Sequence, residues 1–304
     1  EFSVFIALTA VTAVAVQLCG LGAQESLVRR VARDADLYPR FLGHNLLMSG
    51  ASGAILTVLG LVILPGFFEL APHPAANLGL FTLLLLTNIV LARIILLIEQ
   101  IFIAHSDFDS ANRNVILFAL GRLGASGLGC LVFGVDTMSD WIIWSFAAHL
   151  VIAILSIRAV LPLGLPSWNF ERDELRNGLL FCTPFVLKAL RQNADLLLLS
   201  VLAGDEVVAS YGVARRIVDS GYLAVDALNR LVYPGSAAAT RGGLRQALGR
   251  FRKVLAASVG IGLAASVVIV LFAPLLPNLF GPEYVSLPGF TLFLAPTIVL
   301  MAIW

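Results

Sequence analysis

The sequence is poor in charged residues. Only 13% of its 304 residues are charged, whereas a soluble domain carries about 25%. Hydrophobic residues make up 59% of the chain, and the mean hydropathy is +0.93. So few charges exclude an ordinary water-exposed surface. The composition therefore predicts an integral membrane protein.

Lysine and cysteine are also scarce. Eighteen of the twenty cationic residues are Arg and the net charge is only +1, so we expect no nucleic-acid partner. The three cysteines, Cys19, Cys130 and Cys182, are far apart and lack the paired spacing that a zinc site or a disulfide framework requires. We therefore expect no metal and no cofactor.

Long apolar runs dominate the rest of the sequence. A membrane-spanning helix needs about 20 mostly apolar residues, and open strands cannot exist in lipid. The chain is therefore predicted to be all-α, a polytopic bundle of transmembrane helices. Nine candidate helices lie approximately at residues 1–21, 42–65, 78–104, 110–134, 139–163, 177–203, 206–234, 253–277 and 285–304.

Cations occur in alternate connections between these segments. The first, third, fifth and seventh connections carry Arg or Lys, and the others carry none. Because cytoplasmic loops collect cations, we expect the cation-bearing connections to face the cytoplasm. Two of them, Gln24–Ala35 and Gly242–Lys253, are expected to form short surface helices. On this topology the first helix runs from outside to inside, so we expect a fragment that lacks one helix before Glu1.

The two halves of the sequence also resemble one another. An offset that places Phe2 on Tyr211 aligns a spanning helix, an Arg-bearing connection and a second spanning helix in both halves. Many transporters consist of two such related halves. We therefore expect two pseudo-symmetric six-helix lobes around a central cavity. The N-terminal lobe would be residues 1–165, lacking its first helix, and the C-terminal lobe residues 166–304, truncated at its C-terminal end.

Charged residues inside the apolar segments are the most unusual feature. Such residues are costly in a bilayer, and by default they line a pathway or pair internally. Cations exceed acids by three in this set, whereas internal pairing alone requires near balance. The excess predicts a water-filled cationic cavity for an anionic substrate, although Arg216 and Arg230 could instead reach the lipid headgroups. The set comprises Arg93, Arg122, Lys188, Arg191, Arg215, Arg216 and Arg230 with Glu99, Asp195, Asp219 and Asp226.

Two consecutive segments carry most of these charges. In the segment that follows Gly204, five polar residues at helical spacing share one face; they are Arg215, Asp219, Tyr222, Asp226 and Arg230. The preceding segment repeats the pattern with Lys188, Arg191 and Asp195. Because the connection between the two segments is short, these polar faces could meet.

A family resemblance is carried by four short stretches, which are Gly20–Arg30, Asn193–Leu199, Tyr211–Ile217 and Phe280–Tyr284. They are similar to the polysaccharide (O-antigen type) flippases of the multidrug, oligosaccharidyl-lipid and polysaccharide exporter superfamily. The similarity in helix order and loop length covers essentially the whole chain.

The resemblance implies a flippase. Such a protein moves a polyprenyl-diphosphate-linked oligosaccharide from the cytoplasmic to the outer leaflet of the bacterial inner membrane by alternating access, for cell-surface polysaccharide assembly. Its partners would be the lipid-linked substrate, membrane lipids and the polysaccharide polymerase or ligase machinery. Five cations would neutralise the diphosphate and acidic sugars, namely Lys188, Arg191, Arg215, Arg93 and Arg122. Three acids would orient these cations or couple transport to a proton or sodium gradient, namely Asp195, Asp219 and Asp226.

Three alternatives stay open. A multidrug or cation antiporter of the same fold would need an acid-rich cavity, which the Arg excess disfavours. A membrane enzyme acting on the same lipid-linked sugars would need a sizeable outer loop, whereas residues 66–77 hold only Glu69 and His73 as titratable groups. We therefore expect no enzyme. A flippase of lipid-linked peptidoglycan precursors is the nearest alternative, because its substrate is also a polyprenyl diphosphate.

Overall fold

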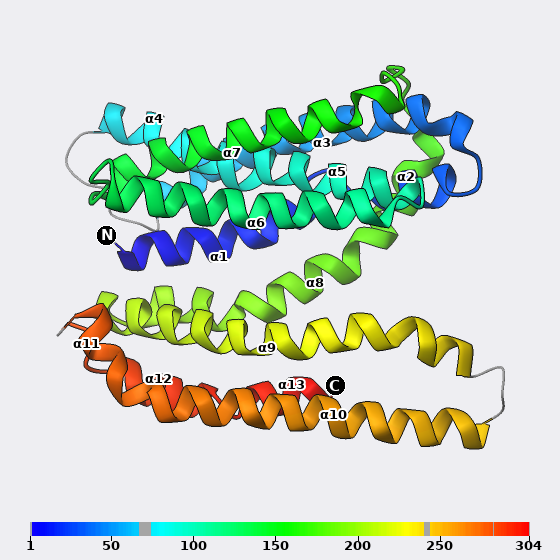
Figure 1. The fold of residues 1–304 in the computed structure, drawn as a ribbon. Helices are drawn as coiled ribbons and strands as arrows, with labels where there is room; N and C mark the ends of the chain where they lie inside the picture. The colour runs from blue at the N-terminus through cyan, green and yellow to red at the C-terminus, as the bar shows by residue number, and fades with distance from the viewer. Residues whose placement is uncertain (1, 67–73, 240–243, 282, 304) are drawn as a thin grey trace. The chain divides into compact units, whose positions relative to one another are not determined.

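The computed structural model describes residues 2–66, 74–239, 244–281 and 283–303, with the backbone alone at residues 66, 74–77, 224, 226–239 and 244–251. Every regular element in these ranges is a helix (Figure 1), which confirms the all-α prediction. The structure also confirms a multi-pass membrane protein, because five helices are long and apolar enough to cross a bilayer.

Each of the nine predicted segments is helical in the structure. They correspond to α1 (Phe2–Leu18), α3 (Tyr38–Ile63), α4 with α5 (Pro74–Leu85 and Ala92–Ala104), α6 (Phe108–Leu131), α7 (Met138–Val160), α8 (Arg172–Leu202), α9 (Asp205–Ala239), α10 (Leu244–Phe272), and α12 with α13 (Leu287–Leu294 and Thr297–Ile303). The charge-bearing helices α8 and α9 are not among the five apolar spans.

Shorter elements join these helices. A π-helical stretch, η3 (Leu86–Leu91), connects α4 to α5, and α2 (Ala23–Val31) lies between α1 and α3. The remaining short elements are η1 (Ala35–Leu37), η2 (Leu64–Gly66), η4 (Leu161–Leu163), η6 (Ala273–Leu275) and α11 (Leu276–Phe280).

The chain divides into two compact units, Glu1–Val201 and Leu202–Trp304. Most of α8 therefore belongs to the first unit by its contacts. The predicted lobe boundary after residue 165 was derived from a sequence repeat. The division into compact units depends on contacts between residues, so it does not test that boundary. That boundary, the pseudo-symmetry and the central cavity stay predictions.

In the first unit, α5 is central. It packs against α2, α6 and α7, while α1 packs against η3 and α2 packs against α3. One apolar cluster includes Leu27, Tyr38 and Ile98, and another surrounds Leu8 and Leu85. Burial of these side chains ties the short helix α2 to the spanning helices, because buried apolar area is the main source of such cohesion.

The first, third and fifth connections gather at one end of this unit. The backbone N–H of Ser167 donates to the carbonyl oxygen of Pro39 at 2.8 Å. The rings of Tyr38 and His105 meet edge to face with centroids 4.8 Å apart. This arrangement agrees with the alternation of cations, which predicted that these connections share one side of the membrane.

In the second unit, α9 packs against α10, α12 and α13 (Figure 1). Its core includes Val218, Leu287 and Ile298. The prediction of a separate surface helix at Gly242–Lys253 is wrong for the part that the structure describes, because residues 244–253 begin the uninterrupted helix α10. No proline interrupts α10 there.

Candidate functional site

The helices α1 and α2 form one bent apolar pair with an angle of 45° between them. The break is built from three consecutive left-handed residues, Gly20, Leu21 and Gly22, with φ angles of 87°, 46° and 76°. Glycine adopts this conformation without steric cost. Broken helices inside a membrane expose backbone groups that line sites in transporters, so the break is a candidate site.

Arg93 lies against this break. Arg93 is only 4% exposed. A Cβ atom on Gly20 would lie 2.7 Å from Arg93 Nη2 and 2.9 Å from Ser49 Oγ. The guanidinium and the hydroxyl therefore converge on the bare Cα of Gly20. Arg93 Nε has no hydrogen-bond partner, so the site holds a buried donor that is not satisfied.

Polar side chains of α3 surround the same point. Ser52 Oγ accepts a hydrogen bond of 2.7 Å from the Gly20 backbone N–H, and Ser49 Oγ donates to Asn45 Oδ1 at 3.1 Å. Asn45 is fully buried, and its Nδ2 has no partner. We call Gly20, Asn45, Ser49, Ser52 and Arg93 the Arg93 cluster. It is a buried polar cluster within the first unit.

A second polar group joins α2 to the start of α8. Glu174 is 3% exposed and accepts hydrogen bonds from Ser26 Oγ at 2.9 Å and Arg29 Nη2 at 2.7 Å. Arg30 also donates to it through Nε and Nη2. We call these four residues the Glu174 clasp. All of them were outside the predicted site.

Close backbone contact accompanies the Glu174 clasp. A Cβ atom on Gly22 would clash with the carbonyl oxygen of Gly178. The guanidinium carbon of Arg29 lies 5.1 Å from the centroid of the Phe181 ring, within the range of a cation–π contact. The turn between α1 and α2 is therefore pressed against α8.

Glu171 makes a parallel contact with α3. Arg40 donates to its carboxylate, with Nη2 at 2.8 Å from Oε2. The Glu171 backbone N–H donates to His44 Nδ1 at 3.2 Å, which places the proton of a neutral imidazole on Nε2. These contacts fix the segment that precedes α8.

The two carboxylates have lowered pKa values, and both lie before the predicted span at residues 177–203. Burial raises the pKa of Glu174, but hydrogen bonds from Arg30 and Ser26 outweigh it and leave the pKa below its usual value. The hydrogen bond from Arg40 lowers the pKa of Glu171. Both groups are therefore charged at neutral pH.

The other predicted cations of the first unit are exposed. Arg122 lies on α6 with its guanidinium carbon 5.5 Å from the Phe118 ring centroid. Lys188 and Arg191 are exposed on α8. Asp195 Oδ1 accepts a hydrogen bond of 2.9 Å from the backbone N–H of Leu196. The Phe118 ring that Arg122 contacts and the Leu196 backbone that Asp195 contacts lie outside the Arg93 cluster.

The second unit contains the predicted polar face of α9. Arg215 Nε lies 3.2 Å from Asp219 Oδ1 and 3.3 Å from Oδ2. The side chain of Arg215 is 15% exposed and that of Asp219 is 52% exposed. Asp226 and Arg230 have side chains outside the part that the structure describes. Because α8 and α9 fall mainly in different units, the predicted meeting of their faces stays a prediction.

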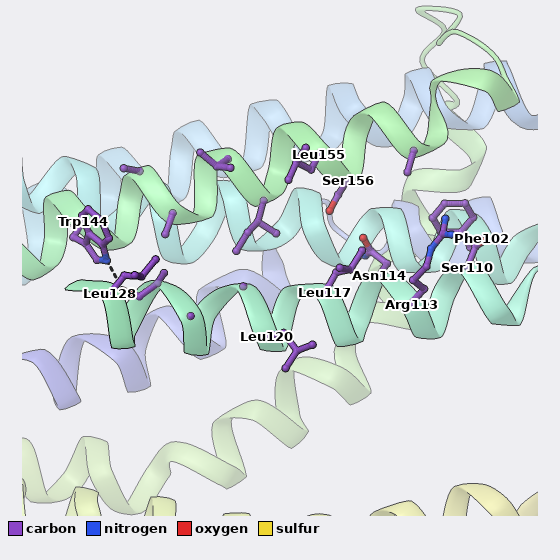
Figure 2. Close-up of a pocket in the computed structure, with 18 residues that line it drawn as sticks. Phe102, Ser110, Arg113, Asn114, Leu117, Leu120, Leu128, Trp144, Leu155 and Ser156 are labelled. Carbon is purple, nitrogen blue, oxygen red and sulfur yellow. Dashed lines mark hydrogen bonds between the residues drawn. The ribbon is translucent and has the colours of Figure 1, made fainter. Parts of the chain in front are cut away.

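A groove of 780 Å³ runs between α6 and α7. Figure 2 shows Arg113, Asn114 and Ser156 toward one end and Trp144 toward the other. Trp144 Nε1 donates to the carbonyl oxygen of Ala125 at 2.6 Å. This groove was not predicted from the sequence. Gly121, Gly124 and Ala125 were an available signal, because small residues let membrane helices approach one another closely.

Metal ligation has no support in the described ranges. No three His, Cys, Asp or Glu side chains within them are placed to hold an ion. Cys19 and Cys182 are buried and Cys130 is exposed, and none of the three forms a disulfide.

No family model matches the sequence, and no curated protein matches it. One solved structure superimposes on 99% of this chain and 72% of its own chain, with a TM-score of 0.72 at 18% identity. It is an inward-facing multidrug resistance MATE family transporter of the MOP superfamily. The chain has the MATE fold.

The MATE fold confirms the predicted helical bundle. At 18% identity the likeness shows the fold alone, and it does not distinguish a polysaccharide flippase from a multidrug transporter.

Proposed function

We propose that the chain is part of a flippase that moves a polyprenyl-diphosphate-linked oligosaccharide from the cytoplasmic to the outer leaflet of the bacterial inner membrane by alternating access. The sign of the embedded charges carries the proposal, because cations exceed acids by three inside the apolar segments. A cationic pathway attracts a diphosphate and acidic sugars and repels an organic cation.

The exposed cations support this assignment. Lys188 and Arg191 on α8 and Arg122 on α6 are exposed in helices that carry long apolar stretches. A charge on such a helix is stable only against water, a partner or a ligand. We assign these three residues to the substrate path, where they form charge-assisted hydrogen bonds with the diphosphate.

Arg215 and Asp219 have a joint role in this proposal. Their side chains are paired on α9, so the acid holds the guanidinium in one orientation. Asp195 and Asp226 are assigned the same kind of role. A change in protonation or ion occupancy at any of the three acids releases a cation for the substrate, which couples transport to a proton or sodium gradient.

Arg93 contributes in a different way. It is enclosed in the first unit, so its contact with a large substrate requires the break at Gly20–Gly22 to open. The other four cations need no such opening.

Two other functions have specific support. The likeness to a multidrug resistance MATE family transporter favours multidrug export. A flippase of lipid-linked peptidoglycan precursors would use the same cations on the same diphosphate. The substrate, the bacterial inner membrane and a polymerase or ligase partner all belong to the proposal.

The proposal is tested by the full-length protein in a bacterium that lacks its own polysaccharide flippase. Wild-type protein is expected to restore surface polysaccharide, and Arg215→Ala is expected to abolish it. Arg33→Ala is the matched control, because Arg33 is exposed in the connection after α2. Unchanged surface polysaccharide in a well-inserted Arg215→Ala variant would overturn the role of Arg215.

A further inference from the structure

The groove between α6 and α7 has two chemically different parts. Its polar end is formed by Ser110, Arg113 and Asn114 of α6 and Ser156 of α7 (Figure 2). Asn114 and Ser156 line the groove and are each 7% exposed, so little of either side chain reaches the outer surface. This end offers one guanidinium, one amide and two hydroxyls, which together suit a phosphate group.

The rest of the groove is apolar. Its lining includes small residues, which leaves room for a chain of methylene or isoprene units to lie against both helices. They are Gly121, Gly124 and Ala125 of α6 and Ala147 and Ala148 of α7, with Trp144 at the far end. A groove with one cationic end and one long apolar part fits an amphiphile with an anionic head.

The length of the groove selects among such amphiphiles. The distance from Arg113 to Leu128 along α6 is roughly 22 Å at the helical rise per residue. Half of the hydrocarbon core of a bilayer is only about 15 Å thick. An acyl chain of a phospholipid remains in its own leaflet, whereas a polyprenyl chain is long enough to continue past the midplane.

The polar end of the groove also lies at the end of α6 where we expect the substrate to bind first. Arg113 is in the second turn of α6, directly after the connection that contains His105. His105 contacts Tyr38 at the end where the first, third and fifth connections gather. That end is cytoplasmic on the sequence-predicted topology, and a lipid-linked oligosaccharide is assembled on the cytoplasmic leaflet in the proposed function.

We propose that the α6–α7 groove binds the polyprenyl chain of the lipid-linked substrate, with the proximal phosphate at Arg113. This inference rests on the proposed function and adds a binding site for the lipid anchor. The groove holds the anchor in the apolar layer while the oligosaccharide crosses. Arg113 pairs with the phosphate at the start of the movement, and Asn114 and Ser156 donate hydrogen bonds to its oxygens.

Two glycines of α6 provide a matched test. A Cβ atom on either Gly124 or Gly127 would meet nothing within 4 Å, so a side chain added at either position begins in open space. Only Gly124 lines the groove. Gly124→Phe therefore fills the groove, and Gly127→Phe controls for the added side chain.

The experiment uses full-length protein in lipid nanodiscs and a polyprenyl phosphate that carries a photoreactive diazirine in its chain. Illumination is expected to label residues of α6 and α7, as mapped by mass spectrometry. Gly124→Phe is expected to lower the labelling about tenfold, since displacing even two methylene groups from an apolar surface has that effect. Gly127→Phe and Arg113→Lys should retain labelling, and Arg113→Gln should weaken it.

Three outcomes would overturn the inference. In the first, Gly124→Phe leaves the labelling of α6 and α7 unchanged. In the second, excess phosphatidylglycerol competes with the probe as well as unlabelled polyprenyl phosphate does, and in the third, α6 and α7 are not labelled because another helix covers the groove. Restoration of surface polysaccharide by the wild type is measured separately. Restoration without groove labelling rejects the anchor site alone, whereas groove labelling without restoration rejects the proposed function alone.

Discussion

Arg29 Nη2 lies 2.7 Å from Glu174 Oε2, although the two residues are 145 positions apart in the sequence. This ion pair joins α2 to the first turn of α8 within one compact unit. The carboxylate is almost fully buried, whereas the side chains of Arg29 and Arg30 are 35% and 45% exposed. Removal of the Glu174 carboxylate charge therefore leaves Arg29 and Arg30 in contact with water.

Glu174→Gln is expected to destabilise the full-length protein by about 2 kcal/mol, the scale of a hydrogen bond to a charged group. The variant loses the charge that Arg29 and Arg30 face. Thermal unfolding in detergent measures the change. Glu171→Gln is the matched control and should cost markedly less, because its partner Arg40 is exposed. Equal costs for the two variants would contradict the importance of the Glu174 clasp.

The stabilising effect of the two carboxylates depends on pH. Their pKa values are lower in the folded protein than the ordinary 4.5, so their contribution is complete above pH 4.5 and is lost as the pH falls through the folded values. The melting-temperature difference between wild type and Glu174→Gln should be constant from pH 7 to pH 5 and shrink at lower pH. A difference that grows on acidification would contradict this assignment.

Gly22→Ala is expected to cost at least about 2 kcal/mol, because an alanine at positive φ is strained and its methyl group clashes with the backbone of α8. Gly50→Ala is the matched control, since a Cβ at Gly50 meets nothing within 4 Å. Alanine in that helix should be neutral or stabilising by up to about 1 kcal/mol. Chemical unfolding of both variants checks this, and similar costs would show that the turn is not tightly packed.

Arg93→Met separates stability from transport. A buried cation is costly, and an apolar residue of similar length is often neutral or stabilising in its place. We expect the melting temperature to be unchanged or higher, while export of the lipid-linked oligosaccharide is lost. A large loss of stability with normal export in the surviving protein would assign Arg93 a purely structural role.

The pair of Arg215 and Asp219 is tested by exchange. Asp219→Asn frees the guanidinium and should change the dependence of transport on the proton or sodium gradient. The double variant Arg215→Asp with Asp219→Arg restores the pair, because residues four apart on a helix remain neighbours. Transport by proteoliposomes under imposed gradients is the measurement. An unchanged gradient dependence in Asp219→Asn would remove this acid from coupling.

The helices were predictable because long apolar runs leave few alternatives in a bilayer. The gathering of the first, third and fifth connections at one end of the first unit also followed from the alternation of cations. The end of the first helix near residue 21 and a separate short helix from Gln24 were predicted, in agreement with the bounds of α1 and α2. The left-handed conformation of residues 20–22 was not predicted, because the sequence there carries no signal for these backbone angles. The interruption depends on left-handed glycines that Arg93 and Gly178 contact in the folded unit.

The candidate site was less accessible from sequence than the fold. Arg93 was identified as an embedded cation, but its burial against Gly20 depends on the packing of three helices. Glu174 lies outside the apolar segments, so its pairing with Arg29 carried no local signal. The groove arises from small residues on two helices, and only their juxtaposition makes a cavity.

The most direct measurement of the central claim is translocation in proteoliposomes. Full-length protein is reconstituted and supplied with a fluorescent polyprenyl-diphosphate oligosaccharide, with a cationic dye in parallel vesicles. The account predicts translocation of the lipid-linked oligosaccharide, its loss in Arg215→Ala, and no transport of the dye. Transport of the dye without movement of the oligosaccharide would contradict the account and establish a multidrug transporter.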